Sequence, residues 1–354
     1  MSEQPMIAKR ILICTAQVPF IRGGAEYLVE GLYDALRERG HVVDVIALPY
    51  QWSPPERIPE SALAWRMLDI TQSNGQPVDH VICTKFPSYM VRHPRKVLWL
   101  VHQHRQAYDW YGTPLSDLTN IPEHRQVRDE IFRMDRRGMG ECYAHYTISR
   151  NVSARLKRFN NIESTALYPP SRYAADLRIG PYGDYILSAS RLDRAKRLDL
   201  LLDAAARMRS PLPVLLAGTG PDRQRLEDIA AKLDLGERVR FLGFVSDAEL
   251  VELYAGARAV YYAPVDEDYG FATVEAFGAA RPVVTTDDAG GVLEFVQDGL
   301  NGLICAPEPA ALARALDAVA ADPALAERMG RAGRPLVDGI TWDKVVDALV
   351  PHTL

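Results

Sequence analysis

The feature that most constrains the fold of this 354-residue chain is an alternation of short apolar runs with amphipathic helical stretches. A short apolar run predicts a buried strand, and a helical stretch between two such runs predicts a parallel sheet covered by helices. We expect strands at, among others, RILICTAQ (10–17), HVICTK (80–85) and AHYTIS (144–149), and a helix after Ser149 as N-cap. The alternation therefore predicts an α/β protein.

The same alternation occurs twice, with a break between the two series. Two prolines interrupt the pattern in YPPSRY (168–173), and the chain is too long for one ordinary domain. We predict two Rossmann-like, doubly wound domains that face a central cleft, with ligands at the carboxyl ends of the strands. Residues 1–172 would form the first domain and 173–335 the second, and a closing helix in 336–354 would pack back on the first domain.

Composition places the chain among soluble globular proteins, with 47% hydrophobic and 25% charged residues. No apolar run approaches the roughly 18 residues that span a bilayer, and Ile11–Cys14 is too short for a signal-peptide core. Cysteines at 14, 83, 142 and 305 lack the spacing of a zinc site or a disulfide scaffold. We therefore expect a cytoplasmic protein.

The net charge of −5 is divided unevenly along the chain. Residues 1–175 contain 22 Lys and Arg against 18 Asp and Glu, whereas residues 176–354 contain 19 against 28. The basic excess is concentrated in Arg125–Arg158. This stretch is either a solvated helix face or a surface for an anionic acceptor or for lipid headgroups at the inner face of the membrane. No nucleic-acid-binding module accompanies it, so nucleic acid is not an expected partner.

The strongest local motif is EDYGFATVE, in which Glu267 and Glu275 are eight positions apart. A helix starting near Thr273 would offer unpaired backbone N–H groups and its positive dipole end to a phosphate or a sugar. Glu275, in the first turn, can accept both hydroxyls of a ribose. Alternatively, Glu275 complements the helix dipole and Glu267 is solvated. The predicted donor-binding residues here are Gly270, Phe271, Ala272, Thr273 and Glu275.

A second motif, SASRLDRAKRLDLLLDA, carries Arg191 and Lys196 between a strand end and a helix. Two fixed cations there can neutralise a leaving diphosphate in place of a metal ion, and an arginine binds two oxygens at once. Alternatively, the two cations cap neighbouring helices. Arg197 is a candidate third cation.

Two glycine pairs are weaker signals for phosphate binding. Gly23 and Gly24 join the first strand to the first helix, where backbone amides can approach a phosphate, although a simple turn would have the same sequence. Gly218 and Gly220 match a Rossmann phosphate loop incompletely, because Arg223 replaces its third glycine.

A predicted strand, KVLWLVHQH, ends at His102 and His104. Two histidines on one side of a strand suit a metal, but no third ligand is evident, so no metal is expected. A strand-end histidine is more often part of the core. The aromatic residues Tyr108, Trp110 and Tyr111 would form either a wall for an acceptor sugar or part of the core.

Together these motifs resemble those of the family 4 retaining glycosyltransferases, of the group 1 type. EDYGFATVE resembles the E-x7-E motif of that family, and DAGGVLEFVQDGLNGL is similar to the segment that follows it. Arg191 and Lys196 match the G-R-x-x-x-x-K-G-type motif, with Ser190 and Arg197 where glycine is usual. GGAE resembles the N-terminal GGxE loop. The resemblance covers most of residues 15–307 and is strongest in the second domain.

The resemblance implies the GT-B fold and transfer of a hexose, with retention, from a UDP- or GDP-sugar. The acceptor would be a glycan, a lipid-linked or a small molecule, in polysaccharide biosynthesis, with no cofactor or metal. Glu267 would bind hydroxyls of the donor sugar and Glu275 the ribose, with His104 preferred over His102 as a further sugar contact. The nucleotide would meet the loop of Gly218 and Gly220, and its base the backbone of Phe244 and Val245.

Two other functions fit the same two-domain scaffold. A nucleotide-sugar 2-epimerase would need acid and base carboxylates near the sugar in the first domain. A non-catalytic protein that binds sugar nucleotides would keep the fold, but the intact E-x7-E motif and the Arg–Lys pair count against it.

Overall fold

The computed structural model describes residues 8–351, which form two compact units. The first unit comprises the chain up to Pro170 and from Thr341 onward, and the second comprises Ser171–Ile340. The boundary between Pro170 and Ser171 lies two residues before the boundary predicted at 172/173. The predicted boundary at 335/336 falls inside helix α10 (Pro323–Asp338), which stays with the second unit.

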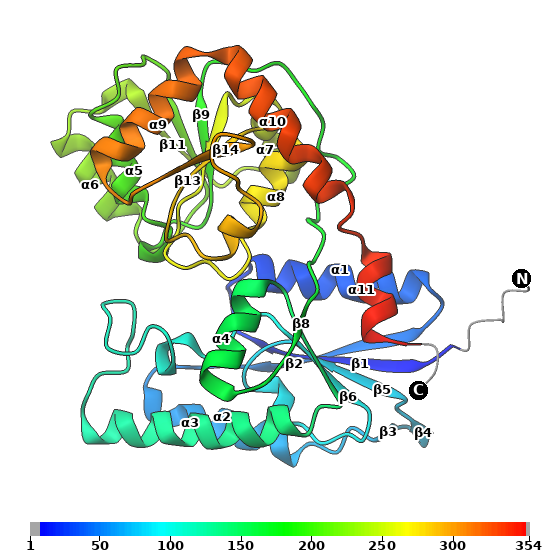
Figure 1. Cartoon of the computed structure of the whole chain (residues 1–354). Coiled ribbons are helices and arrows are strands. Elements are labelled where there is room, and N and C mark those ends of the chain that lie inside the picture. The colour runs from blue at the N-terminus through cyan, green and yellow to red at the C-terminus, as the bar shows by residue number, and fades with distance from the viewer. Residues whose placement is uncertain (1–7, 352–354) are drawn as a thin grey trace, which may run out of the picture. The chain divides into compact units, whose positions relative to one another are not determined.

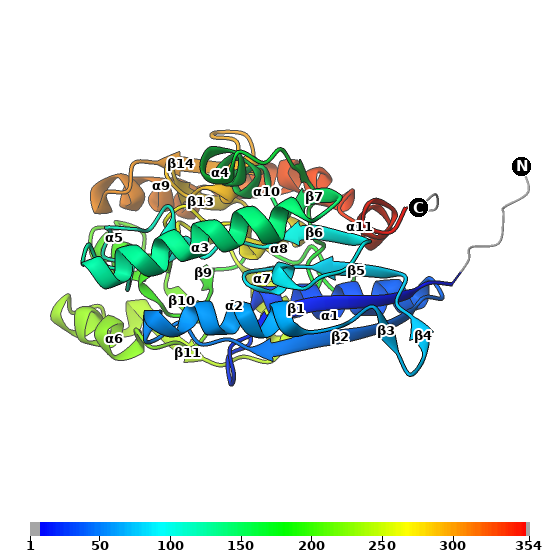
Figure 2. The ribbon, with the colours of Figure 1, turned by 90° about the horizontal axis from the view of Figure 1, so that it is seen from below.

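The first unit is built on a six-stranded parallel sheet with the order β2-β1-β5-β6-β7-β8 (Figure 2). Its strands are β1 (Arg10–Gln17), β2 (Val42–Pro49), β5 (His80–Cys83), β6 (Lys96–Leu100), β7 (Ala144–Thr147) and β8 (Thr165–Ala166). A small antiparallel hairpin, β3 (Gln72–Ser73) and β4 (Gln76–Pro77), lies outside the sheet. The strand order reverses between β1 and β5, because β2 and β5 lie on opposite sides of β1.

Helices cover both faces of this sheet, with α1 and α11 on one face and α2 and α3 on the other (Figure 1). They are α1 (Gly24–Glu38), α2 (Ile58–Met67), α3 (Pro122–Gly140), α4 (Arg150–Asn160) and α11 (Trp342–Leu349), with single 3-10 turns at η1 (Pro55–Arg57), η2 (Ser88–Met90) and η3 (Arg105–Ala107). The predicted N-cap of α4 is confirmed, because Ser149 Oγ accepts a hydrogen bond of 3.0 Å from the Val152 amide.

The closing helix α11 packs on α1 of the first unit. A Cβ atom at Gly31 would overlap the indole of Trp342, so the missing side chain lets the two helices approach closely. Trp342 also packs edge-to-face on Trp99, with ring centroids 6.2 Å apart. At the end of α1, Arg39 pairs with Asp343 at 2.7 Å. The last helix therefore belongs to the first unit.

The second unit contains a six-stranded parallel sheet with the order β11-β10-β9-β12-β13-β14. Its strands are β9 (Ile186–Ala189), β10 (Val214–Ala217), β11 (Val239–Gly243), β12 (Ala259–Tyr261), β13 (Val283–Thr286) and β14 (Gly302–Cys305). Here the strand order reverses between β9 and β12. The prediction of two α/β domains with parallel sheets is confirmed.

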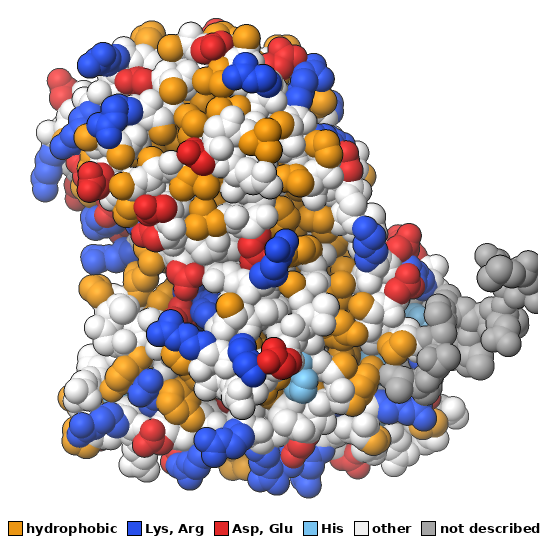
Figure 3. Space-filling view, in the orientation of Figure 1, with side chains coloured by type: hydrophobic (Ala, Val, Ile, Leu, Met, Phe, Trp, Pro, Cys, Tyr) orange, Lys and Arg blue, Asp and Glu red, His pale blue; other side chains and the backbone are white. Residues whose placement is uncertain are grey.

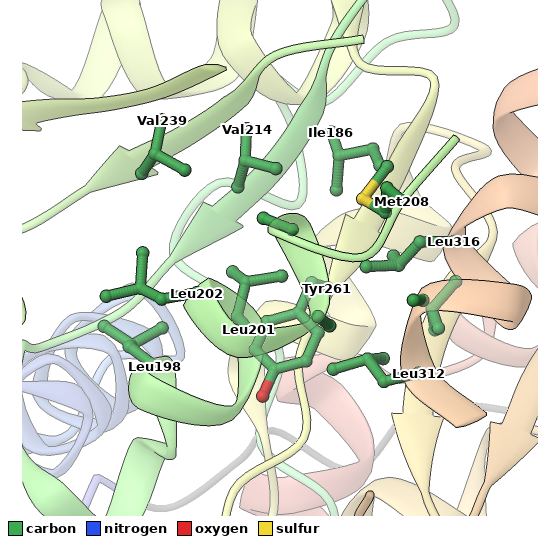
Figure 4. Close-up of a cluster of buried hydrophobic side chains, with 14 of the residues drawn as sticks. Ile186, Leu198, Leu201, Leu202, Met208, Val214, Val239, Tyr261, Leu312 and Leu316 are labelled. Carbon is green, nitrogen blue, oxygen red and sulfur yellow. The ribbon is translucent and has the colours of Figure 1, made fainter. Parts of the chain in front are cut away.

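The helices of the second unit again cover both faces, with α5, α6 and α9 on one face and α7 and α8 on the other (Figure 1). Their bounds are α5 (Leu198–Ala205), α6 (Arg223–Lys232), α7 (Asp247–Gly256), α8 (Phe271–Gly278) and α9 (Pro309–Ala321), with 3-10 turns at η4 (Arg194–Lys196), η5 (Gly236–Arg238) and η6 (Gly291–Glu294). Figure 4 shows the core between α5, α9 and the sheet, with Leu198 and Leu202 facing Val214 and Val239. Within the described residues, no helix is both long and apolar enough to cross a membrane.

Candidate functional site

The second unit brings three predicted residues to one edge of its sheet. Arg191 and Lys196 follow β9, and Glu267 follows β12. These two strands flank the point where the strand order reverses, and parallel α/β sheets bind ligands in the crevice that forms there. The topology thus explains why side chains about 70 residues apart in sequence converge.

Lys196 and Glu267 form an ion pair, and Tyr262 completes it. Lys196 Nζ donates to Glu267 Oε2 and, over 3.1 Å, to the hydroxyl of Tyr262, which itself donates to Glu267 Oε2 over 2.9 Å. Burial lowers the pKa of Lys196, but Glu267 and Tyr262 raise it by more, so its net pKa lies above the ordinary value. Lys196 is therefore a fixed positive charge, and the interpretation of Glu267 as a solvated loop acid is wrong.

Arg191 lies beside this pair with 46% of its side chain exposed. Its Nε is 4.0 Å from Asp193 Oδ2. Burial raises the pKa of Asp193, the charges of Lys196 and Arg191 oppose the rise, and Glu267 adds to it. Because both cations and Glu267 act on Asp193, the four charged groups share one electrostatic environment. An exposed guanidinium in such a cluster can bind an anion.

Gly218 and Gly220 shape the loop that carries Arg191. A Cβ atom at Gly218 would overlap the carbonyl oxygen of Ser190, and one at Gly220 would overlap that of Leu192. The Leu192 amide also donates to the Thr219 carbonyl over 2.9 Å. The two glycines therefore let the loop after β10 pack directly on the backbone flanking Arg191. Their contact with a nucleotide stays a prediction.

Arg197 has a structural role, and the interpretation of it as a third cation for the diphosphate is not supported. Its backbone is left-handed, with φ of 49°. Its guanidinium binds both carboxylate oxygens of Asp288 at 2.7 and 2.8 Å, the hydroxyl of Thr286 at 2.7 Å, and the carbonyls of Ala263 and Pro264. Arg197 thus braces the segments that follow β12 and β13.

We expect Arg197→Ala to lower the free energy of unfolding by about 2–3 kcal/mol, because it removes all five bonds of this partly buried network. Arg197→Gly should regain up to about 1 kcal/mol of that loss, since glycine accepts a left-handed backbone. Urea denaturation measures both effects. Arg207→Ala, which alters an exposed arginine just after α5, is the matched control. Equal stability of the Ala variants at 197 and 207 would contradict the structural role of Arg197.

Helix α8 begins at Phe271, two residues earlier than predicted. Phe271, Ala272 and Thr273 form its first turn, behind Gly270 as N-cap with φ of 88°. The left-handed backbone favours glycine here, and a Cβ atom at Gly270 would also lie tightly, 3.0 Å from the Val292 side chain.

Glu275 is the fifth residue of α8, so its predicted place in the first turn is wrong, as is its role at the helix dipole. The side chain is buried and accepts hydrogen bonds from Ser171 Oγ at 3.0 Å and the Tyr254 hydroxyl at 2.9 Å. Burial raises the pKa of Glu275, and these two bonds oppose the rise. These two bonds occupy part of the acceptor capacity of the carboxylate, and its contact with a ribose stays a prediction.

Phe244 and Val245 follow β11, at the same carboxyl edge of the sheet. The Phe244 side chain is 83% exposed, and Val245 is partly buried. Their predicted contact with a nucleotide base stays a prediction.

In the first unit, the Gly23–Gly24 turn has a capping role. The Gly23 amide donates to Glu26 Oε2 over 3.0 Å, and Glu26 Oε1 accepts from Lys85 Nζ over 2.8 Å. One amide predicted for a phosphate thus already has a protein partner, which favours the turn interpretation. Sequence reasoning missed Lys85, because the strand predicted through it ends at Cys83.

The strand predicted to reach His104 ends at Leu100, so the expectation that both histidines point to one side does not apply. His102 Nδ1 lies 2.8 Å from the Gln103 carbonyl. His104 is buried, with Nδ1 3.0 Å from the hydroxyl of Tyr50, a residue that the sequence did not single out. Burial, and then the charge of His102, lowers the pKa of His104 to about 3. His104 is therefore neutral near pH 7.

The aromatic and basic residues that follow His104 in the sequence mostly bind or stack on other side chains of the first unit. Tyr108 is buried and donates to Asp135 over 2.6 Å, which confirms the core interpretation for this residue. Arg128 stacks on the Tyr111 ring at 4.1 Å, and Arg155 pairs with Asp109 at 3.4 Å. Figure 3 shows Lys and Arg side chains predominating along the edge of the first unit where α3 runs.

Within residues 8–351, no cluster of three or more His, Cys, Asp or Glu side chains is arranged to hold a metal ion.

Comparisons with known proteins bear on the family and the fold. The sequence model of the family described as glycosyl transferases group 1 matches residues 173–335, almost the whole second unit. An uncharacterised glycosyltransferase of Methanocaldococcus jannaschii is 25% identical, over 94% of this chain and 94% of its own. Among solved structures, sucrose-phosphate synthase of Thermosynechococcus elongatus matches with a TM-score of 0.78 and 20% identity, over 95% of this chain and 96% of its own.

A second solved structure is HepE of Anabaena in complex with UDP-glucose. It matches with a TM-score of 0.71 and 17% identity, over 96% of this chain and 98% of its own. At such identities the solved structures show the fold, which is the two-domain GT-B fold. The family match assigns residues 173–335 to the glycosyl transferases of group 1, and over its whole length the chain is similar to a glycosyltransferase.

Proposed function

We propose that this protein transfers a hexose from a UDP- or GDP-sugar to a glycan, a lipid-linked or a small-molecule acceptor, with retention of anomeric configuration, as in family 4. The observation that carries the proposal is the Lys196–Glu267 pair beside Arg191, at the carboxyl edge where the strand order reverses. Two cations and a carboxylate at one place suit a diphosphate and the hydroxyls of the attached sugar.

Each residue has a role that follows from its chemistry. Arg191 and Lys196 bind the diphosphate, and Glu267 accepts bonds from sugar hydroxyls. During transfer, the bond from the anomeric carbon to the diphosphate breaks, and its electron pair leaves with the diphosphate. A new bond joins the anomeric carbon to the acceptor oxygen, whose proton is released. The cations stabilise the negative charge that grows on the leaving group, and we propose that they do so without a metal ion.

Support for a uridine nucleotide comes from HepE, which was solved with UDP-glucose and shares the fold. The base itself would meet the segment after β11, where the exposed Phe244 offers an aromatic surface. An aromatic ring can stack on uracil and on guanine alike, so both donors belong in the test.

The test is a thermal-shift screen of UDP-, GDP- and ADP-sugars, followed by transfer of radiolabelled sugar from any donor that binds. A donor at 100 times its Kd should stabilise the protein by about 2.7 kcal/mol. Transfer should persist in EDTA. The proposal fails if no sugar nucleotide raises the melting temperature. Formation of an epimer from donor alone would favour the 2-epimerase, and binding without transfer or hydrolysis would favour a non-catalytic protein.

A further inference from the structure

An aromatic cluster in the first unit holds the ring of His104. Tyr50 follows β2, Phe86 follows β5, and His104 follows β6, so three different strands deliver them to one edge of the sheet. The His104 ring is 5.5 Å from the Phe86 ring and meets the Tyr50 ring edge-on at 6.1 Å and 87°. Phe86 and Tyr50 contact each other at 5.9 Å. The imidazole therefore has little freedom to rotate.

The two nitrogens of this imidazole have different surroundings. Nδ1 lies 3.0 Å from the Tyr50 hydroxyl. Nε2 is buried and has no hydrogen-bond partner within the described part of the chain. Buried polar atoms are almost always paired, so Nε2 is the side of the ring on which a ligand atom is expected.

The chemistry of the two partners decides which nitrogen carries the proton. A neutral imidazole has one N–H group and one nitrogen lone pair. A phenol hydroxyl is a good donor and a weak acceptor, whereas the imidazole lone pair is a strong acceptor. The stronger bond therefore has the Tyr50 hydroxyl donating to Nδ1, and the ring proton then lies on Nε2. Burial, which lowers the pKa of His104, keeps the ring neutral.

We propose that Tyr50 is a positioning residue that fixes His104 as the Nε2–H tautomer, so that His104 offers a hydrogen-bond donor, and not a base, to an oxygen of the transferred sugar. The part concerning the sugar rests on the proposed function and on the contact between His104 and the donor sugar that the resemblance to family 4 implies. An Nε2–H group has no lone pair with which to take a proton from an acceptor hydroxyl. His104 then orients the sugar and takes no part in proton transfer.

The tautomer is tested directly by NMR of the full, ligand-free chain with ¹⁵N-labelled histidine. The His104 signals are assigned by their loss in His104→Gln. We expect the wild-type proton on Nε2, and in Tyr50→Phe a shift toward a mixture of the two tautomers, because the donor to Nδ1 is gone. A wild-type proton on Nδ1, or an unchanged tautomer in Tyr50→Phe, overturns the proposal.

The functional part is tested by kinetics with the donor found in the screen. Tyr50→Phe should lower kcat by about 10- to 100-fold, with a smaller change in the donor KM, because a misoriented contact weakens the transition state more than binding. Tyr33→Phe is the matched control, since it also removes a phenol hydroxyl from the first unit. That hydroxyl accepts an exposed hydrogen bond from Arg37 over 3.2 Å. Melting temperatures show that both variants are folded.

These two experiments separate the inference from the function on which it rests. Equal kcat values for Tyr50→Phe and Tyr33→Phe would overturn the role of Tyr50 in transfer. If the wild type transferred no sugar, the proposed function would fail together with the sugar contact, while the NMR result would still decide the tautomer.

Discussion

Arg191→Ala is expected to lower kcat by about 10²- to 10³-fold, the usual effect of removing one preorganised donor to a developing negative charge. The guanidinium is nearly half exposed, and its nearest described carboxylate is 4.0 Å away, so it contributes little to folding. The melting temperature should therefore change by no more than about 2 °C. Steady-state kinetics and thermal unfolding of the same sample measure the two effects.

Two further variants show whether this effect belongs to the site. Arg240→Ala removes another half-exposed arginine of the second unit, paired with Glu237 at 3.4 Å, and should leave kcat within about twofold of wild type. Lys196→Met should lower kcat and also destabilise the fold, because it leaves the partly buried Glu267 without its cation. Near-normal turnover by Arg191→Ala would refute its role at the diphosphate.

The sequence predicted the fold well where apolar residues recur regularly along one helix face or fill one strand. Leu28, Leu32 and Leu36 recur at helical spacing, and all three are buried on α1. It did not predict α3, whose 19 residues are so rich in charge that few apolar positions, such as Val127 and Ile131, reveal its buried face. Strand β14 (Gly302–Cys305) was also missed.

The candidate site was predictable only where its residues lie in one local motif. Lys196 and Glu267 each belong to such a motif. Tyr262 lies 66 residues from Lys196 and follows the strand adjacent to β9. Tyr50 lies 54 residues from His104, and the strands they follow, β2 and β6, are separated by β1 and β5, so only the folded sheet and its loops bring these two together. The place of Glu275 was mispredicted because α8 starts two residues early, which moves it from the first turn to the second.

A buried carboxyl group in the first unit should give the folded protein an unusual dependence on pH. Asp135 of α3 is fully buried and accepts hydrogen bonds of 2.6 Å from the hydroxyls of Tyr89 and Tyr108. Burial raises its pKa from 3.8 to about 7, although these two bonds oppose the rise. Between these pH values the folded state keeps the proton that the unfolded chain loses. The contribution of Asp135 to stability is thus full below about pH 4 and is lost as the pH rises through 7.

The contribution of His104 to stability changes with pH in the opposite direction, over nearly the same pH range. Its folded pKa of about 3 lies below the ordinary 6.5, so its contribution is full above pH 6.5 and is lost as the pH falls toward 3. With rising pH, Asp135 lowers the free energy of unfolding and His104 raises it, each by about 1.4 kcal/mol per pH unit. The two effects oppose each other between about pH 4 and 6.5. In the wild type these two contributions therefore partly cancel, and a variant is needed to separate them.

Asp135→Asn removes one of the two titrations and nearly preserves the shape of the side chain. The free energy of unfolding of the variant relative to wild type should rise by about 4 kcal/mol between pH 4 and pH 7, since about three pKa units are lost at 1.36 kcal/mol each. At pH 4 the two proteins should be of similar stability, because the protonated carboxyl and the amide are both neutral and each offers a carbonyl acceptor and a donor. Urea denaturation at several pH values measures the difference, and Asp129→Asn, on the exposed side of α3, is the control. Parallel pH profiles for wild type and Asp135→Asn would mean that Asp135 is ionised in the folded protein throughout this range.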